Sequence, residues 1–568
     1  MSAVIQHLHT YFLFPFSVDK QAVLADHREL HKKQNRWIDV VDGWISMAPE
    51  RAASLLVQRL GPWKRTSYQR FDMESPTYQD MVFFHPFVRR IFFDTGDSGA
   101  QSEAESLLRC YEIHPPRDRK LFFEAEDAKR RGAAVEVTDL RLMMFANGIG
   151  ILSIGVEAFG VSAAQMLWIN EAMRKVYPSS GRQLREARAP HRIALVVEHN
   201  GQREVLAEER YEKGEMIGFQ PPLARTVTAL LYFADYQRLE YEPVLDERMI
   251  VCSYAAVDPA SVPQDFVESE DYQVLLSRMI YVDRYGSSYR YDIRFTRDSM
   301  GRHLYRRWAH QGTWYGFTSY SSITATIGAH DCDEHDLREG FLVHRMFRTR
   351  YYLMSMIALF YRATLLDFAE RTALVSKRFY LDHEDGKFDA DSIRLATDLR
   401  ADFLHFSNYW HFDELANKDE EIEHFALQCR EYRIATMKAE IEEEIEKLNA
   451  SLQSYSQFRN TEAVNRLAML SLILGAGAVL TGFFGMNFGR GFSRAFFEPD
   501  PRFLWFHYGA IAVVALMAFG SIAFGVFVVL ANWVDYREIL GPRAAGRRRD
   551  GEAASLRRAQ TGPRGRDQ

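Results

Sequence analysis

Cysteine is scarce in this sequence: there are four in 568 residues, and no two of them form a CxxC pair. A zinc ribbon or a disulfide framework requires cysteines at short or regular spacings, so the sequence predicts neither. Isolated thiols are typical of a protein in a reducing compartment. The four residues are Cys110, Cys252, Cys332 and Cys429.

An excess of basic charge is also absent, because 70 Lys and Arg stand against 76 Asp and Glu, for a net charge of −6. This balance excludes a nucleic-acid-binding protein whose whole surface is basic. Neither a phosphate loop nor a nucleophile–base pair is recognisable. Gly148-Ile149-Gly150 with Gly155 does not match the dinucleotide fingerprint, since no suitable helix opens after it. We therefore expect neither an enzyme nor a resident cofactor.

A signal peptide is missing as well. The first residues carry no basic stretch before a long apolar core, and Tyr11-Phe12-Leu13-Phe14 is too short and is followed by Pro15. We expect the long segment that precedes any membrane helix to remain in the cytoplasm.

Charged residues are absent from two windows near the C-terminus, between Arg466 and Arg490 and between Arg502 and Asp535. About 20 apolar residues suffice for a helix to cross a bilayer core of about 30 Å. The windows predict two transmembrane helices, at 466–488 and 509–533. Interfacial aromatic residues bracket the second: Trp505, Tyr508 and Trp533.

Two membrane helices return the C-terminus to the side of the N-terminus. The tail at 534–568 is rich in arginine, as expected for a cytoplasmic segment, and in Gly, Pro and Ala, so we expect it to be disordered. The loop at 489–508 is then the outer segment. These features predict a multi-pass protein of the inner (plasma) membrane with both termini in the cytoplasm.

Residues 1–336 mix strand and helix signals and predict a cytoplasmic α/β domain, making the fold class α+β followed by long helices. Asn200-Gly201 between two β-rich runs predicts a hairpin with a type I′ turn. A helix is expected at 161–176. Strands are expected at 11–16, 82–87, 192–198, 205–206, 226–233, 249–254, 289–295 and 313–320.

Residues 337–412 predict a helical hairpin, with helices at 337–377 and 391–410. Arginines within the first helix, at 345, 348, 350 and 362, would be costly in lipid and exclude a third membrane span. The preceding segment His330-Asp331-Cys332-Asp333-Glu334-His335-Asp336 is dense in metal ligands. It fits the acidic N-terminal end of a helix, with an accessory metal site as the alternative. His344 and His405 are interpreted as partners in ordinary hydrogen bonds.

Residues 413–465 predict a stalk helix. Ile441, Ile445, Leu448, Leu452 and Tyr455 alternate spacings of four and three, as in a coiled coil. Neither proline nor glycine occurs from 419 to 474, so we expect an unbroken helix from Asp419 to Phe484. Two membrane helices enclose no lumen, and the protein must therefore form an oligomer in order to conduct ions.

One face of the first membrane helix is small and partly polar. Such a stripe either packs tightly against another helix or lines a narrow pore. Asn487 at its outer end favours the pore, because a ring of amide oxygens can hold a hydrated Mg2+, which gives up its waters reluctantly. The expected pore-lining residues are Thr461, Val464, Leu467, Ser471, Gly475, Ala478 and Gly482.

Gly485-Met486-Asn487, at the end of the penultimate membrane helix and followed by a short loop and one more span, resembles the CorA family of divalent-cation transporters. The resemblance implies a homopentamer with a cytoplasmic α/β funnel and a filter at Gly485, Met486 and Asn487. It also implies Mg2+ uptake driven by the membrane potential and closed by intracellular Mg2+, with Co2+ and Ni2+ as further candidate ions.

The sequence departs from the family pattern at the inner pore, where Thr461 falls in place of an asparagine and Gly475 in place of a bulky gate residue. Phe484 replaces the tyrosine that commonly precedes the filter. The outer loop offers only Glu498 and Asp500 as acidic residues. These departures leave the gate and the ion selectivity open.

Two alternatives remain: a zinc transporter of the ZntB type, and a membrane-anchored sensor or scaffold without ion flux.

The acidic residues at the start of the stalk have two interpretations as well. Asp419, Glu420 and Glu423 belong either to a solvated helix face or to a regulatory metal site between protomers.

Overall fold

The computed structural model describes residues 3–20, 23, 37–45, 55–66, 82–93, 107–127, 131–177, 190–210, 223–237, 239–245, 248–284, 291–328, 342–384, 390–485, 501–502 and scattered positions from 505 to 527. The chain divides into two units, Met1–Asn449 and Ala450–Gln568. The predicted cluster at 330–336 and the tail at 534–568 lie outside the described residues.

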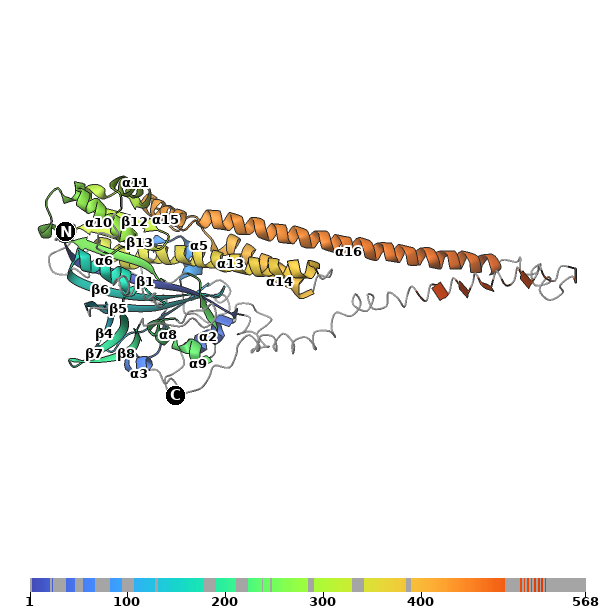
Figure 1. The fold of residues 1–568 in the computed structure, drawn as a ribbon, viewed down its shortest axis with the longest axis horizontal. Helices are drawn as coiled ribbons and strands as arrows, with labels where there is room; N and C mark the ends of the chain where they lie inside the picture. The colour runs from blue at the N-terminus through green and yellow to red at the C-terminus, as the bar shows by residue number, and fades with distance from the viewer. Residues whose placement is uncertain are drawn as a thin grey trace. The chain divides into compact units, whose positions relative to one another are not determined.

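The first unit is built on a 13-stranded, mostly antiparallel sheet with the order β11-β12-β13-β10-β1-β6-β5-β4-β7-β8 (Figure 1). Strand β9 pairs with β1, β3 with β5, and β2 with β3. The strands are β1 Val4–Val18, β2 Lys64–Thr66, β3 Leu108–Glu112, β4 Arg119–Glu126, β5 Gly132–Phe145, β6 Ile149–Ser162, β7 Arg192–His199, β8 Gln202–Arg210, β9 Tyr241–Pro243, β10 Ile250–Val257, β11 Leu304–Tyr305, β12 Thr313–Thr318 and β13 Ser321–Ile327.

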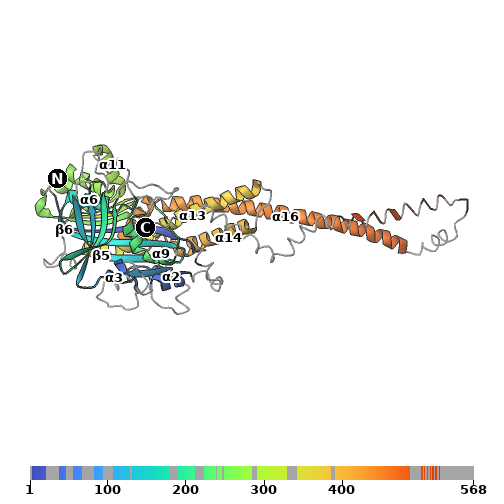
Figure 2. The ribbon, with the colours of Figure 1, turned by 60° about the horizontal axis from the view of Figure 1, so that its bottom comes forward.

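Strand β1 lies within the sheet, between β6 and β10, and helices cover both of its faces. Side chains of a strand alternate between the two faces. On one face, Thr10 donates a hydrogen bond to Asn170 of α6 (Ala163–Met173), which Figure 2 shows beside β6. On the other, His9 contacts His344 of α12 (Leu342–Met346). Burial on both sides explains the uninterrupted apolar run from Tyr11 to Phe16 in β1.

Helix α12 continues through a π-helical turn, Phe347–Tyr351, into the long helix α13, Tyr352–Glu384. The helix at 342–382 is long and apolar enough to cross a membrane, but 72% of its most apolar window is buried inside the protein. Its contacts with β1 and β6 identify it as a core helix of this unit. Helix α14, Ala390–His405, packs against it and ends in a π-helical turn, Phe406–Trp410.

The other described helices that precede α12 in this unit are shorter than α13. They are α2 Trp37–Ile45, α3 Leu55–Leu60, α5 Pro86–Phe92, α8 Arg225–Leu230, α9 Tyr232–Gln237, α10 Glu270–Ile280 and α11 Ile293–His303, with short 3-10 turns at Pro259–Ser261, Phe266–Glu268 and Ala309–Gln311.

Several predicted elements are confirmed. The strands near 11–16, 192–198, 249–254 and 313–320 are present, as is the helix within 161–176. In the hairpin between β7 and β8, Asn200 and Gly201 have φ of 52° and 75°. Two successive positive φ angles are the signature of the predicted type I′ turn.

Three predicted strands are wrong. At 82–87, Pro86 occupies the first turn of α5, a position that suits a residue without an N–H. At 226–233, the chain forms α8 and α9, with Val227, Leu230 and Leu231 buried at helical spacing. In the described part of 289–295, the Asp292 carboxylate accepts hydrogen bonds from the next turn and caps α11.

The predicted helix from Asp419 is interrupted. Helix α15 covers Asp419–Glu431, and α16 runs from Ile434 to Gly485. Arg433 between them adopts a φ of 57°. Tyr432, which is buried with its ring against the Arg362 guanidinium, closes α15. A tertiary contact thus ends a helix in which the sequence shows no glycine or proline.

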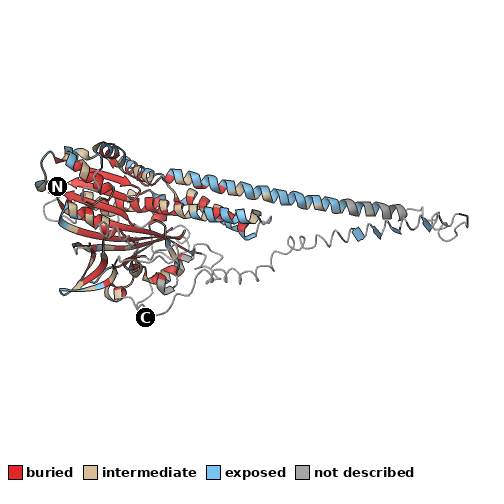
Figure 3. Cartoon of the chain, in the orientation of Figure 1, coloured by how far each residue is buried: buried red, intermediate tan, exposed pale blue. Residues whose placement is uncertain are grey.

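Helix α16 is one helix over 52 residues, as the absence of glycine and proline through Leu474 predicts. Figure 3 shows the strands and α13 largely buried, whereas most described side chains of α16 are exposed. Within the first unit, Ile441 and Ile445 of the predicted coiled-coil positions are buried.

Candidate functional site

The predicted pore stripe lies entirely within α16. Steps of three and four residues along one helix place its members on a single face. Val464 and Leu467 are 61% and 56% exposed, and among the described residues nothing beyond its own helix backbone lies within 4 Å of the position that a side chain at Gly475 would occupy. The remaining members are Thr461, Ser471, Ala478 and Gly482.

The predicted filter begins at the end of this helix. Gly485 is the last residue of α16. Met486 and Asn487, and the acidic residues Glu498 and Asp500, lie outside the described residues. Their roles remain predictions.

The predicted regulatory carboxylates lie in the first turns of α15, where acidic residues oppose the helix dipole. The Tyr351 hydroxyl donates to Glu420 at 3.1 Å. Glu423 accepts a hydrogen bond of 2.5 Å from the Tyr305 hydroxyl and lies 3.5 Å from the Arg307 guanidinium. Asp419 is exposed.

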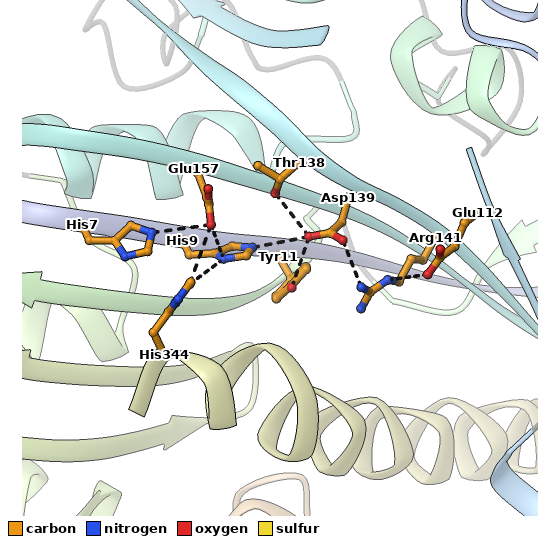
Figure 4. Close-up of polar contacts among 9 residues, drawn as sticks. All are labelled: His7, His9, Tyr11, Glu112, Thr138, Asp139, Arg141, Glu157 and His344. Atoms are coloured by element: carbon orange, nitrogen blue, oxygen red, sulfur yellow. Dashed lines mark hydrogen bonds and ion pairs between the residues drawn. The ribbon is translucent and has the colours of Figure 1, made fainter. Parts of the chain in front are cut away.

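A second group of polar side chains lies within the first unit, between the sheet and α12. Among the described residues it is the one group of three or more His, Cys, Asp or Glu whose ligand atoms all lie within 4.8 Å of one another. We call it the histidine–glutamate cluster (Figure 4). Its members are His7, His9, Glu157 and His344, which are 1%, 0%, 5% and 0% exposed.

Strand geometry explains how the cluster assembles. His7 and His9 are two residues apart on β1 and therefore project from the same face. Glu157 is the register partner of His9 on the neighbouring strand β6. His344 approaches this face from α12.

The Oε1 atom of Glu157 is the common point of the cluster. It lies 3.0 Å from His9 Nδ1, 3.5 Å from His7 Nε2 and 3.7 Å from His344 Nε2. His9 Nδ1 and His344 Nε2 are in turn 3.0 Å apart.

Burial favours the neutral form of His9 and His344. Desolvation lowers the pKa of His9, and it lowers the pKa of His344 to about 2 with help from the two neighbouring imidazoles. Burial would raise the pKa of Glu157, but the contacts with His7 and His9 bring it below its usual value. A neutral imidazole and an ionised carboxylate are the forms that bind metals.

A second carboxylate, Asp139 of β5, stands behind the cluster with its Oδ2 3.8 Å from His9 Nε2. Arg141 donates to its other oxygen at 3.0 Å, and Thr138 and Tyr11 donate to Oδ2 at 3.2 and 3.4 Å (Figure 4). Burial would raise the pKa of Asp139, but the charge of Arg141 lowers it. Asp139 is therefore a fixed anion facing the far side of the His9 ring.

Sequence reasoning missed this cluster. His344 is interpreted from the sequence as a hydrogen-bonding partner, and it does contact His9, but its place in a four-residue group is legible only in the fold. One signal was available: the alternation His7, His9, Tyr11 puts three polar rings on one face of the strand.

Comparison with known proteins gives one match. Residues 405–530, 126 of the 568, match the family model described as CorA-like Mg2+ transporter protein. This segment contains α15, α16, the whole of the first charge-free window and all but the last four residues of the second. Comparisons of the chain with curated proteins and with solved structures return no match.

Proposed function

Because residues 405–530 of this chain belong to the CorA-like Mg2+ transporter family, we propose that the protein is a channel for divalent cations that takes up Mg2+. The family consists of transporters, and the chain is accordingly a membrane transporter of divalent cations and not an enzyme. The membrane potential is the proposed driving force, worth about 2.3 kcal/mol per charge per 100 mV, so that a dication needs no ATP.

The exposed apolar surface of α16 is the observation that carries this proposal. Val464, Leu467, Met469 and Leu474 are 56–70% exposed in the chain by itself. Burying apolar surface gains about 25 cal/mol per Å2, so several large side chains left in water would be costly. In a membrane transporter that forms oligomers, the lipid bilayer and further copies of the same helix would bury this apolar surface.

The conducting unit is proposed to be a homopentamer in which α16 lines the pore. One chain contributes two membrane helices, which cannot surround an aqueous path, whereas several copies of α16 can. The small side chains at Ser471, Gly475 and Ala478 would leave room for a hydrated ion along the axis. Gly485, Met486 and Asn487 would form the filter at the outer end.

Regulation is proposed to involve the acidic start of α15. Asp419 is exposed, and Glu423 is held by Tyr305 and Arg307 of its own chain. A hydrated Mg2+ bound beside these carboxylates would compete with the Arg307 guanidinium for the ion pair with Glu423. Carboxylate oxygens and waters are the ligands that Mg2+ prefers.

Flux through liposomes containing the purified protein tests the proposal. Asn487→Ala should lower Mg2+ influx at an imposed potential by at least about ten-fold, equivalent to about 1.4 kcal/mol in the barrier. Asn449→Ala, the same truncation in the first unit, is the matched control and should conduct normally. Oligomer mass is measured on each variant, so that lost flux is not confused with lost assembly.

Three outcomes would contradict the proposal in different ways. Flux of Zn2+ without flux of Mg2+ would mean that the transported ion is zinc and not magnesium. Equal Mg2+ flux in both asparagine variants would remove Asn487 from the filter. Intact oligomers of the unaltered chain that pass no divalent cation would indicate a sensor or scaffold.

A further inference from the structure

The histidine–glutamate cluster has a proton arrangement that a cation would change. A neutral imidazole carries one proton, yet His9 Nδ1 lies 3.0 Å from both His344 Nε2 and Glu157 Oε1. Without a cation, a proton on His9 Nδ1 alone must be shared between these two acceptors. A proton on His344 Nε2 instead leaves either two N–H groups or two lone pairs facing each other across one of the contacts. A cation among the four atoms lets each of them direct a lone pair toward it.

Unpartnered nitrogens give a second indication. The ring atoms His7 Nε2, His9 Nε2 and His344 Nδ1 are buried, and none of them makes a hydrogen bond of good geometry with another described residue. The approach of His7 Nε2 to Glu157 Oε1, at 3.5 Å, is a long contact between the two groups. A buried polar atom without a hydrogen bond is costly. A metal bond to His7 Nε2 would remove that cost.

The distances fit a small tetrahedral ion. Zinc bonds of 2.0–2.1 Å to nitrogen and oxygen place the ligand atoms about 3.3 Å apart at tetrahedral angles. The four short separations within the cluster are 3.0, 3.0, 3.5 and 3.7 Å. The widest separation is at most 4.8 Å, so a small inward movement of the ligands completes the shell.

The ligand types select among metals. Three imidazoles and one carboxylate suit Zn2+ and other late transition metals, whereas Mg2+ prefers oxygen ligands and retains waters. The cluster is therefore chemically different from the proposed pore, which offers neutral oxygens and small side chains.

Asp139 supplies the outer support that metal-binding histidines usually have. With His9 Nδ1 on the metal, the proton of His9 moves to Nε2, which faces Asp139 Oδ2 at 3.8 Å. A carboxylate behind a histidine fixes the tautomer and strengthens the metal bond. Its orientation is set by Arg141.

We propose that the histidine–glutamate cluster is a binding site for one Zn2+-type ion per chain. All four ligands come from the protein and are at most 5% exposed, so the shell is closed to substrate and the site is structural. The metal would connect β1 and β6 to α12, and through α12 to the beginning of α13. This proposal is independent of ion transport.

Metal content of the full chain is the direct test. The protein is purified in detergent with an affinity tag that contains no histidine, stripped with a strong chelator, reloaded with Zn2+ and dialysed. We expect one equivalent of zinc by elemental analysis, retained in a large excess of Mg2+. His7→Gln and His344→Gln should each weaken zinc binding at least about 100-fold, because even changes behind the ligands cost 10–100-fold. The exposed His310→Gln is the matched control and should bind zinc normally.

Cobalt provides a readout that does not depend on the variants folding. Co2+ added to the stripped, unaltered chain should give the intense visible bands of a four-coordinate ion, and one equivalent of Zn2+ should abolish them. Weak bands of six-coordinate Co2+, or no uptake, would overturn the proposal. Zinc retained in full by both His7→Gln and His344→Gln would do the same, since it would then lie elsewhere, for example in the pore.

Discussion

The Nδ1 atom of His9, on the central strand β1, lies 3.0 Å from the Nε2 atom of His344, on α12, although 335 positions separate the two residues along the chain. Helix α12 leads without interruption into α13, which packs against β1 and β6. The contact therefore joins the middle of the sheet to the beginning of its longest covering helix.

Metal removal should loosen this junction. A ligand that binds only the folded state stabilises it by about 2.7 kcal/mol at a concentration 100 times its dissociation constant. We expect a chelator to lower the melting temperature of the unaltered chain in detergent, and Zn2+ to restore it. The His344→Gln variant should melt at a lower temperature that no longer responds to either addition. An equal response in both proteins would assign the chelator effect to another site.

A side chain at Gly155 should destabilise the sheet. A Cβ at this position would lie 2.8 Å from Tyr11 Cε1 and 2.9 Å from Asp139 Cβ, both of them rigidly placed atoms. We expect Gly155→Ala to reduce the free energy of unfolding by about 1–3 kcal/mol, as overpacked cores do. Denaturant titration followed by near-UV circular dichroism measures this change.

Gly43→Ala is the matched control for that substitution. Gly43 lies in helix α2, and no described residue outside that helix comes within 4 Å of where an alanine methyl group would be. Alanine there should therefore leave the free energy of unfolding unchanged or raise it by up to about 1 kcal/mol. A similar loss in both variants would mean that the crowding at Gly155 is not the cause.

Acid should destabilise the first unit through His411. Burial, with the positive charge of Lys438 beside it, lowers the pKa of His411 to about 4, against the partial opposition of Asp413. The unfolded chain takes up a proton near pH 6.5, so the stabilisation from this residue is complete above that pH. It declines as the pH falls and is lost below about 4.

His411→Phe should remove this part of the pH dependence while retaining the ring contacts with Tyr361 and Phe406. Between pH 6.5 and 4 the unaltered chain should lose about 3 kcal/mol more than the variant, from about 1.4 kcal/mol per pH unit. The free energy of unfolding of both proteins is measured by denaturant titration at each pH. If it falls in parallel for the two proteins as the pH is lowered, His411 does not titrate in this way.

Neutralising the exposed start of α15 should alter the response to Mg2+. If Asp419 and Glu423 bind the regulatory ion, millimolar Mg2+ should protect the unaltered chain from limited proteolysis, and Asp419→Asn with Glu423→Gln should lose that protection. Glu443→Gln, further along α16 and paired with Lys447, is the control. Protection that persists in the double variant would place the regulatory ion elsewhere.

The sequence predicts those parts of the fold that depend on local chemistry. Asn200-Gly201 specifies its turn without help from the rest of the chain, and the helix within 161–176 and the continuity of α16 follow from spacing and composition. The family resemblance, drawn from Gly485-Met486-Asn487 and its position, is confirmed by the match over 405–530.

Tertiary contacts decided the remainder. The apolar run at 226–233 has the composition of a strand, but it is buried at helical spacing against the core. Arginine is not a residue type that predicts the end of a helix, so the sequence gives no sign of the break at Arg433. The break before α16 depends on the burial of Tyr432. The histidine–glutamate cluster depends on β1 pairing with β6 and on α12 returning to the same face, neither of which can be read from residue spacing.

The position of β1 has a consequence for biosynthesis. Its partner β10 begins at Ile250, so residues 19–249, 231 in number, are translated between the two strands. At about 5–20 residues per second, β1 waits on the order of 10–50 s for one of its edges to be covered. During this interval a 15-residue, largely apolar segment would present an unpaired strand edge to the cytosol. The nascent chain would then be a natural client for a ribosome-associated chaperone until β10 emerges.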